Sequence, residues 1–379
     1  MKKYKLGDIC EIVSGSTPKT NITEFWDGDV KWITPAELDE NTYIITDSVR
    51  KITNLAMQKT GLTAFPAGTV ILSSRAPIGK VAIAGCKMCC NQGFKNFICS
   101  EIVNNKYLYW FLKHNTAYLN SLGRGATFKE ISKSIVSSIE IDLPSLEEQK
   151  RVVDNIEKIS TIITLRKKEI SILDDLIKAR FVELFGDQTT NPYGWQKASI
   201  GACCTLKSGT SLPADKENEG GAIPYVKVSD MNYPGNEQYI TTSSRFVSEQ
   251  TAGTGVFPVG TVVFPKRGGA IGTNKKRLTR IPICADLNVM GVTAGIRLTP
   301  QYLMAYFSNI DLGTLNNGSS VPQINNKDIA PLLICLPPMV LQQQFAEFVI
   351  QVDKSKATVQ KALDETQFLF DSLMQKYFG

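Results

Sequence analysis

The sequence predicts an α+β protein built from two similar halves, each with a globular part followed by one long helix. Three observations support this fold class. The 379-residue chain repeats its own landmarks about 193 residues later, each half begins with short apolar runs between Gly- and Pro-rich turns, and residues 147–185 and 340–378 contain neither Gly nor Pro. A chain of this length is too long for one ordinary core and fits two domains.

The internal repeat appears as pairs of similar segments in the same order along both halves. Three of the pairs are LGDICEIVSGSTP at 6–18 with IGACCTLKSGTSLP at 200–213, FPAGTVILSSRAPIG at 65–79 with FPVGTVVFPKRGGAIG at 257–272, and the helix entrance LPSLEEQKRVV at 143–153 with LPPMVLQQQFAEF at 336–348. Because both order and spacing are kept, the chain is a tandem duplication, roughly 1–186 and 187–379.

The first part of each half is rich in Val, Ile and Thr, in runs such as TVIL and KVAIA that are bounded by turns. This composition indicates an α+β or mainly β globular unit. The aromatic stretches YLYWFL at 107–112 and YLMAYF at 302–307 predict short helices packed on it.

In the long helical segments, apolar residues recur in alternating steps of three and four, the pattern of a coiled-coil seam. At 1.5 Å per residue each helix would be about 55–60 Å long, which favours an antiparallel spacer between two globules, related by a pseudo-twofold axis, over a lid on one globule. The residues expected on the seam are Ile156, Ile159, Ile163, Ile170, Leu173 and Ile177 in the first helix, and Val352, Val359, Leu369 and Leu373 in the second.

Positive charge is concentrated in equivalent windows of the two halves. Neither the segment from Ser48 to Ser100 nor that from Gln250 to Ala285 contains Asp or Glu, although 36 of 379 residues are acidic and the net charge is only +6. This repeated exclusion predicts surfaces that face phosphates; the alternative is solvated basic loops without a partner. The candidate DNA-binding residues are Arg75, Lys80, Lys95, Arg124, Lys266, Arg267, Lys275, Lys276 and Arg277.

Two of these candidates, Arg75 and Arg267, occupy equivalent places, each after a β-like run and before Gly or Ala-Pro. An arginine there can bind guanine O6 and N7 or hold a phosphate, and the sequence does not decide between these roles. The segments between shared landmarks differ widely. Residues 213–222, PADKENEGGA, have no counterpart in the first half.

The chain lacks the residue patterns of a catalytic or metal site. His114 is the single histidine, NPYG at 191–194 lacks a proline of the amino-methyltransferase motif, and PIGKV at 77–81 lacks the hydroxyl residue of a phosphate-binding loop. CKMCC at 86–90 has no second cysteine pair, so buried thiols are favoured over zinc. We therefore expect no catalytic residues, metal or cofactor. Nine cysteines without an export signal predict reduced thiols in the cytoplasm.

Several landmarks together resemble the DNA specificity subunits of type I restriction-modification systems. These are LGDICEIVSGSTP, WDGDVKWITPAEL, SSRAPIGKVAIA with NQGFKNF, LPSLEEQKRVV, and FVELFGDQTTNPYGW. The second half departs further from the pattern, with PKRGGAIG for SSRAPIG and VLQQQ for LEEQK. The resemblance implies target-recognition domains at 1–146 and 187–339, and spacer helices at 147–186 and 340–379.

The resemblance also implies a function without chemistry of its own. Each target-recognition domain would read one half of an asymmetric, bipartite site in double-stranded DNA. The chain would recruit two modification subunits, which are adenine methyltransferases for DNA methylation, and through them ATP-dependent motor-nuclease restriction subunits. The alternatives are the recognition subunit of another restriction class, whose partner fuses nuclease and methyltransferase, and a protein-interaction scaffold that does not meet DNA.

Overall fold

The structure is a computed structural model that describes residues 2–39, 42–75, 77–125, 129–315 and 321–379. The chain divides into two compact units. The first comprises residues 1–167 with 361–379, and the second comprises residues 168–360. Two helices of 40 residues each, α6 (Leu146–Phe185) and α11 (Met339–Phe378), therefore contribute one part to each unit.

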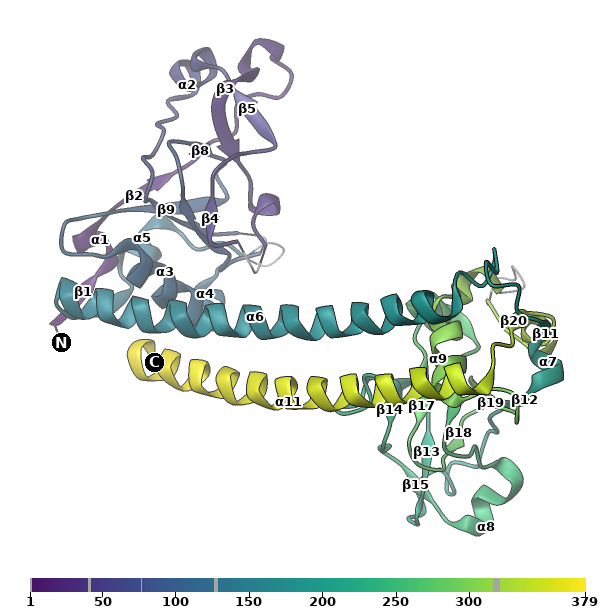
Figure 1. Ribbon diagram of the computed structural model, residues 1–379. Helices are drawn as coiled ribbons and strands as arrows, with labels where there is room; N and C mark the ends of the chain where they lie inside the picture. The colour runs from purple at the N-terminus through teal and green to yellow at the C-terminus, as the bar shows by residue number, and fades with distance from the viewer. Residues whose placement is uncertain (1, 40–41, 76, 126–128, 316–320) are drawn as a thin grey trace. The chain divides into compact units, whose positions relative to one another are not determined.

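The described residues of the first unit form three sheets (Figure 1). The largest has the order β2 (Cys10–Ser14), β9 (Phe94–Cys99), β6 (Val70–Ser73), β7 (Val81–Ala84) and β4 (Ile44–Ile45). The second has the order β5 (Arg50–Ile52), β3 (Trp26–Ile33) and β8 (Cys89–Cys90), and the third pairs β1 (Lys2–Lys5) with β10 (Glu140–Leu143). The pairs β4–β7 and β3–β8 are parallel, and the other pairs are antiparallel.

Short helices complete the first unit, and α3 forms the centre of its core. They are α1 (Leu6–Ile9), α2 (Asn54–Thr60), α3 (Asn105–His114), α4 (Thr116–Leu122) and α5 (Lys133–Ser137), with 3-10 turns at Thr23–Phe25 and Pro35–Glu37. The N-cap of α3 is Asn104, whose side chain accepts hydrogen bonds from the backbone N–H groups of Lys106 and Tyr107. All six residues 107–112 are buried between the larger sheet and α6.

The second unit repeats this architecture with the same strand order. The largest sheet has the order β12 (Cys204–Ser208), β19 (Val289–Ala294), β16 (Thr261–Pro265), β17 (Arg277–Thr279) and β14 (Tyr239–Ile240). The second has the order β15 (Phe246–Val247), β13 (Ile223–Val226) and β18 (Cys284–Ala285). The third pairs β11 (Lys197–Ser199) with β20 (Leu333–Cys335). Its helices are α7 (Ile200–Cys203), α8 (Glu249–Ala252), α9 (Pro300–Ser308) and α10 (Asn326–Ile329), with 3-10 turns at Val228–Asn232, Gly253–Gly255, Gly268–Thr273 and Leu312–Leu315. The predicted α+β fold and its internal repeat are thereby confirmed.

The repeated Ser-Gly dipeptide has a steric explanation. At Gly15 the chain leaves β2 and passes the end of β8, and a Cβ there would lie 2.0 Å from the carbonyl oxygen of Cys90. At Gly209 the chain leaves β12 in the same way, and a Cβ would lie 2.1 Å from the carbonyl oxygen of Asp286. Only glycine allows backbone to approach backbone this closely, so both halves need it.

The repeated helix entrance also has a physical explanation, beginning with Gln149 on the first turn of α6. Its side chain is fully buried. Its Oε1 accepts a hydrogen bond from the Asn104 backbone N–H (2.8 Å), and its Nε2 donates to the carbonyls of Ile102 (3.0 Å) and Pro144 (2.9 Å). One side chain thus satisfies three backbone groups that the fold removes from water.

Gln342, on the first turn of α11, makes the equivalent three bonds in the second unit. It is also fully buried. Its Oε1 accepts from the Thr299 backbone N–H (2.9 Å), and its Nε2 donates to the carbonyls of Arg297 (3.0 Å) and Pro337 (2.9 Å). The glutamine shared by LPSLEEQ and LPPMVLQ therefore joins each long helix to the loop before α3 or α9.

Within the first unit, the C-terminal part of α11 runs antiparallel to the N-terminal part of α6 (Figure 1). Ile156 shares a core cluster with Met374, and ten residues further along α6 Arg166 donates hydrogen bonds to the Ala362 carbonyl and the Thr366 hydroxyl. As residue numbers increase along α6, the residues of α11 that they contact have decreasing numbers, which confirms the predicted antiparallel pairing.

The helix segments of the second unit are antiparallel as well. Phe181 packs against Phe345 with ring centroids 5.6 Å apart, while Asp174, earlier in α6, forms an ion pair of 2.5 Å with Lys356, later in α11. Arg180 interrupts the apolar pattern of α6 and places its guanidinium over the Phe348 ring at 5.7 Å. A polar residue on the seam is thus accommodated by a cation–π contact.

Nine of the ten predicted seam residues are buried or half-buried, and one is not. The nine are Ile156, Ile159, Ile163, Ile170, Leu173, Ile177, Val352, Val359 and Leu373. The prediction for Leu369 is wrong, because its side chain is 49% exposed. Phe370 takes the seam position and packs edge-on against Trp110 at 5.8 Å.

In the described part of the chain, no helix is both long and apolar enough to cross a membrane.

Candidate nucleic-acid interface

The two equivalent arginines lie on matching backbone bridges. Arg75 follows β6 and forms an antiparallel bridge with Glu130, and Arg267 follows β16 and forms one with Gln323. Next to each bridge, a fully buried isoleucine donates its N–H to the residue before the arginine: Ile131 to the Ser74 carbonyl and Ile324 to the Lys266 carbonyl, both at 2.9 Å. Both arginines therefore project from fixed backbone at the end of a central strand.

In the first unit, the bridge brings two cations, Arg75 and Lys95, against one carboxylate. Glu130 lies 3.6 Å from the Arg75 guanidinium and 3.4 Å from the Lys95 ammonium. Lys95 is buried and also donates to the Ser74 hydroxyl at 3.3 Å. On its other side, Glu130 exchanges two backbone hydrogen bonds with Arg124, whose side chain is exposed. Arg75 and Arg124 thus flank Glu130.

In the second unit, the equivalent arginine, Arg267, has the neutral Gln323 as its bridge partner. The Arg267 side chain is exposed, and no carboxylate of residues 129–315 or 321–379 forms an ion pair with it. Lys266 donates to the Ser208 hydroxyl at 2.8 Å, and burial together with the charge of Arg267 lowers the pKa of its ammonium. Arg267 is therefore available to an external anion.

Other predicted cations direct their donors inward. Lys80 donates to the carbonyls of Pro35 (3.0 Å) and Leu38 (2.5 Å), and Lys275 donates to the Asn232 side chain. Because these donors bind loops of their own unit, Lys80 and Lys275 stabilise those loops. The sequence shows the charges but not the oxygen atoms that they meet.

Lys276 and Arg277 show the same behaviour at β17. Lys276 is buried, donates to Asn274 (2.7 Å) and to the Ile310 carbonyl (2.5 Å), and has its pKa lowered to about 8 by burial. Arg277 donates to the carbonyls of Asn236 (2.5 Å) and Met231 (3.2 Å). Of the nine predicted cations, Arg75, Arg124 and Arg267 are the ones that best combine exposure with a fixed backbone position.

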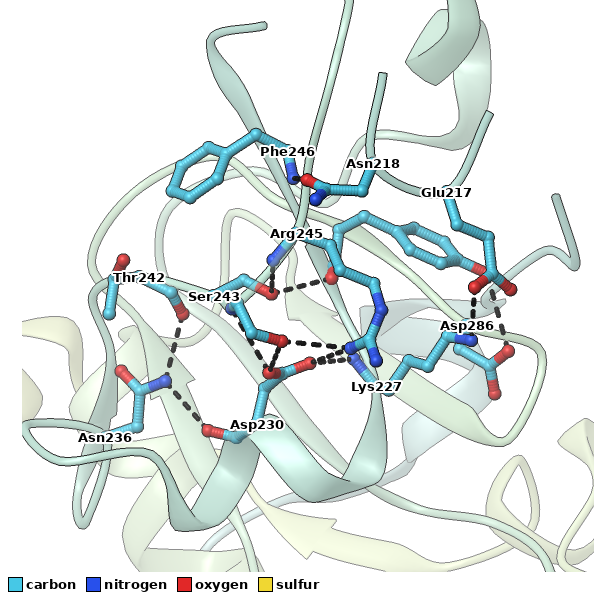
Figure 2. Close-up of polar contacts among 12 residues, drawn as sticks. Glu217, Asn218, Lys227, Asp230, Asn236, Thr242, Ser243, Arg245, Phe246 and Asp286 are labelled. Carbon is cyan, nitrogen blue, oxygen red and sulfur yellow. Dashed lines mark hydrogen bonds and ion pairs between the residues drawn. The ribbon is translucent and has the colours of Figure 1, made fainter. Parts of the chain in front are cut away.

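Sequence reasoning missed a buried carboxylate in the second unit, Asp230, which is 2% exposed (Figure 2). It accepts hydrogen bonds from the Lys227 backbone N–H (2.8 Å) and from both the backbone (3.2 Å) and hydroxyl (2.7 Å) of Ser244. The Arg245 guanidinium lies 3.6 Å away, and the Lys227 ammonium pairs with Glu217 at 2.6 Å. Glu217 belongs to PADKENEGGA, so this segment docks on the smaller sheet.

The corresponding place in the first unit has an equivalent carboxylate, but its arginine binds a different group. Glu37 accepts from the backbone N–H groups of Thr34 and Val49, both at 2.8 Å, as Asp230 does in the other half. Arg50, which corresponds to Arg245, stacks over the Trp26 ring at 3.5 Å. The pairing of WITPAEL with YVKVSDM is the sequence signal that could have located this acid in both halves.

In each unit, a tyrosine–carboxylate contact fixes the globular part to a long helix. Tyr43 donates to Glu157 of α6, which also pairs with Lys106 at 2.9 Å. Tyr239 donates to Asp353 of α11, and burial, with the nearby carboxylate, raises the pKa of Tyr239 to about 12. Both contacts are partly buried, so they hold the candidate interface of each unit at a fixed orientation to its helices.

Reactive groups are not gathered into a site in the part of the chain that the structure describes. No group of three or more His, Cys, Asp or Glu side chains is arranged there to hold a metal ion. The nine cysteines are free, and burial raises the pKa of Cys89 to about 11 and that of Cys90 to about 12. Cys89 and Cys90 are therefore poor nucleophiles near neutral pH.

Comparison with known proteins identifies the family. A family model, the type I restriction modification DNA specificity domain, matches residues 1–173 and 192–366. The chain belongs to this family. The type I restriction enzyme MjaIX specificity subunit of Methanocaldococcus jannaschii is 30% identical over 399 residues, covering 98% of this chain and 91% of that relative. The EcoR124I/EcoR124II specificity subunit of Escherichia coli is 26% identical over 190 residues, covering 45% of this chain and 46% of the relative.

Solved structures of specificity subunits share the fold. The S subunit from M. genitalium has a TM-score of 0.61 at 14% identity and covers 100% of this chain and 96% of its own. A chain from work on complex assembly and conformational transition of the type I system has a TM-score of 0.62 at 20% identity, covering 100% and 97%. The curated relatives of this chain are named as specificity subunits of type I restriction enzymes.

Proposed function

We propose that this specificity subunit reads a bipartite, asymmetric target in double-stranded DNA, one half with each globular part. The observation that carries the proposal is the repeated bridge that holds Arg75 and Arg267 at equivalent strand ends. One backbone frame is used twice, with different neighbours around the arginine. That is the arrangement expected of two readers that recognise two different base sequences.

The two long helices support the second part of the proposal, which is a fixed gap between the half-sites. A 40-residue helix is about 60 Å long, and the antiparallel contacts within each unit leave little freedom for one helix to slide along the other. In this proposal the helix length sets how many unread base pairs separate the two half-sites.

The decisive experiment is a methylation map. The specificity subunit is co-expressed with its adenine-methylating modification subunit in a host free of DNA methylation, and 6-methyladenine is located by single-molecule sequencing. We expect a split motif with a fixed gap, which is absent when the modification subunit is expressed alone. A continuous motif, or methylation independent of this chain, would overturn the proposal.

Charge reversal at the two arginines tests which globular part reads which half. Arg75→Glu is expected to weaken binding about 10- to 100-fold, because it removes a cation and adds repulsion to DNA. The loss should be sensitive to the sequence of one half-site only, and Arg267→Glu should affect the other. Binding is measured by titration of duplexes in which one half-site at a time is scrambled. Each variant serves as the control for the other, and a loss by Arg75→Glu that ignores which half is scrambled would contradict the assignment.

The exposed apolar face of α6 is the surface that we propose for docking a modification subunit. In the second unit this face carries Ile172 (55% exposed) and Leu176 (44% exposed), one helical turn apart, next to the half-buried seam residues Leu173 and Ile177. Apolar residues in neighbouring turns that have no cover within their own unit are typical of a partner surface.

Replacing this face should separate docking from DNA binding. The double variant Ile172→Lys with Leu176→Lys is expected to lose co-purification with the modification subunit, because two charges would have to be buried in the interface. DNA affinity of the specificity subunit alone should stay within about twofold. The control is Ser171→Lys, an exposed position on another face of the same helix. Equal loss of the complex in the control would argue against a localised docking face.

A further inference from the structure

Glu130, which lies outside the acid-free window, places its carboxylate against two cations of that window. Residues 48–100 contain no Asp or Glu, yet the fold brings Glu130 against Arg75 and Lys95 of this window. A negative charge beside DNA phosphates is repelled by them. The presence of Glu130 next to Arg75, the arginine proposed to read DNA, therefore requires a physical reason.

The backbone does not require a charge at this position. Gln323 forms the equivalent bridge with Arg267, and the flanking hydrogen bonds from Ile131 and Ile324 have the same length. The Gln323 side chain donates to the Asn325 side chain at 2.8 Å. Since the second unit holds the same bridge with a neutral amide, the carboxylate of Glu130 is a local choice of the first unit.

The Glu130 side chain is partly exposed, and its backbone is held by hydrogen bonds. Its side chain is 40% exposed, and its backbone is bonded on both sides, to Arg124 directly and to Ser74 through Ile131. Bridged residues on adjacent strands place their side chains on one face, so Arg75, Glu130 and Arg124 form a row. The row borders a shallow depression of about 420 Å³ that is lined by Arg124, Glu130, Ser132, Ser134, Ile135 and Ser138.

We propose that the position shared by Glu130 and Gln323 determines base specificity in each half-site, an inference that rests on the proposed function. A carboxylate only accepts hydrogen bonds and an arginine only donates them. In the major groove, guanine presents the acceptors N7 and O6, and its partner cytosine presents the N4 donor. Arg75 and Glu130 together therefore complement one G·C pair.

Gln323 gives the second unit a different reading chemistry. An amide carries both a donor and an acceptor, so it can bind adenine N6 and N7 or tolerate several base edges. The Gln323 amide, next to Arg267, can therefore bind a base edge that has no amino group. The two half-sites should therefore differ at the base pair that this position faces.

Reciprocal substitutions test the inference, because equivalent backbone bridges hold a carboxylate in one unit and an amide in the other. Glu130→Gln and Gln323→Glu are made in the full chain and assembled with the modification subunit. Preferences are measured by selection from duplex libraries that are randomised in one half-site at a time. Glu130→Gln should lower discrimination at one base pair of the first half-site about tenfold or more. Gln323→Glu should create a preference for an amino-bearing base in the second half-site, with the opposite half unchanged in both cases.

The controls separate base reading from general charge effects. Glu101→Gln removes an exposed carboxylate outside the arginine row and should leave every preference unchanged. An affinity change that is uniform over all sequences in Glu130→Gln would overturn the inference, as would unaltered preferences in both swapped variants. A wild-type complex that selects no split sequence would instead overturn the proposed function, and the inference with it.

Discussion

Replacing Gln342 by leucine is expected to destabilise the second unit by roughly 3 kcal/mol or more, whereas the same change at Gln343 should have almost no effect. The leucine would leave one backbone N–H and two carbonyls buried without a partner, each costing about 1–3 kcal/mol. Gln343 is exposed one residue further along the same helix turn. The expected result is a large fall in the unfolding midpoint for the first variant alone.

Gln149→Leu should reproduce the effect in the first unit, because its three bonds match those of Gln342. Chemical denaturation of the full chain, followed by proteolysis to identify the unit that opens first, measures both variants. Gln344→Leu is a second exposed control. If the buried and exposed glutamines proved equally tolerant of leucine, the hydrogen bonds at the helix entrance would not contribute to stability.

The second large effect is expected at Gly15 and Gly209. Adding one methyl group to either would place it about 2 Å from a carbonyl oxygen of the neighbouring strand, well inside contact distance. Because that oxygen belongs to backbone, it cannot rotate away, and the smaller sheet must shift. We expect Gly15→Ala and Gly209→Ala to cost about 3 kcal/mol or more and to yield protein that is cleaved rapidly by protease.

Two other glycines provide a matched control. A Cβ on Gly269 or Gly272 would meet no atom within 4 Å. Gly269→Ala and Gly272→Ala should therefore keep the unfolding midpoint close to that of the unchanged chain. Protease resistance in Gly209→Ala equal to that in Gly269→Ala would show that the strand crossing is more adaptable than its geometry indicates.

The features that depended on repetition or periodicity could be predicted from the sequence. The absence of Gly and Pro over 147–185 located a helix that spans 146–185 in the structure, and the three-four spacing placed Ile156 and Ile163 on its buried face. On α11, Leu369 and Phe370 are adjacent and both apolar, so spacing alone could not choose between them. Phe370 lies on the seam because it packs against Trp110, which is 260 residues earlier in the chain.

Features that depend on long-range contacts could not be predicted in this way. The parallel pairings β3–β8 and β4–β7 join segments with no local sequence signal. Sequence position identified Lys276 as a cation in a basic window, but only the fold reveals that the Ile310 carbonyl receives its ammonium. The same limitation concealed Glu130, which lies outside the acid-free window that it enters.

The division of the long helices between the units has a consequence for the order of synthesis. Met374 and Phe378, in the last turns of α11, are buried in the core of the first unit, where Phe378 packs against Tyr107 at 5.0 Å. A ribosome adds about 5–20 residues per second, so more than 200 residues beyond position 167 take on the order of 10 s or longer. Throughout that interval the nascent first unit lacks part of its own interior and exposes an apolar surface. The first unit, although residues 1–167 are made early, can complete its core only after residues 361–378 have been translated.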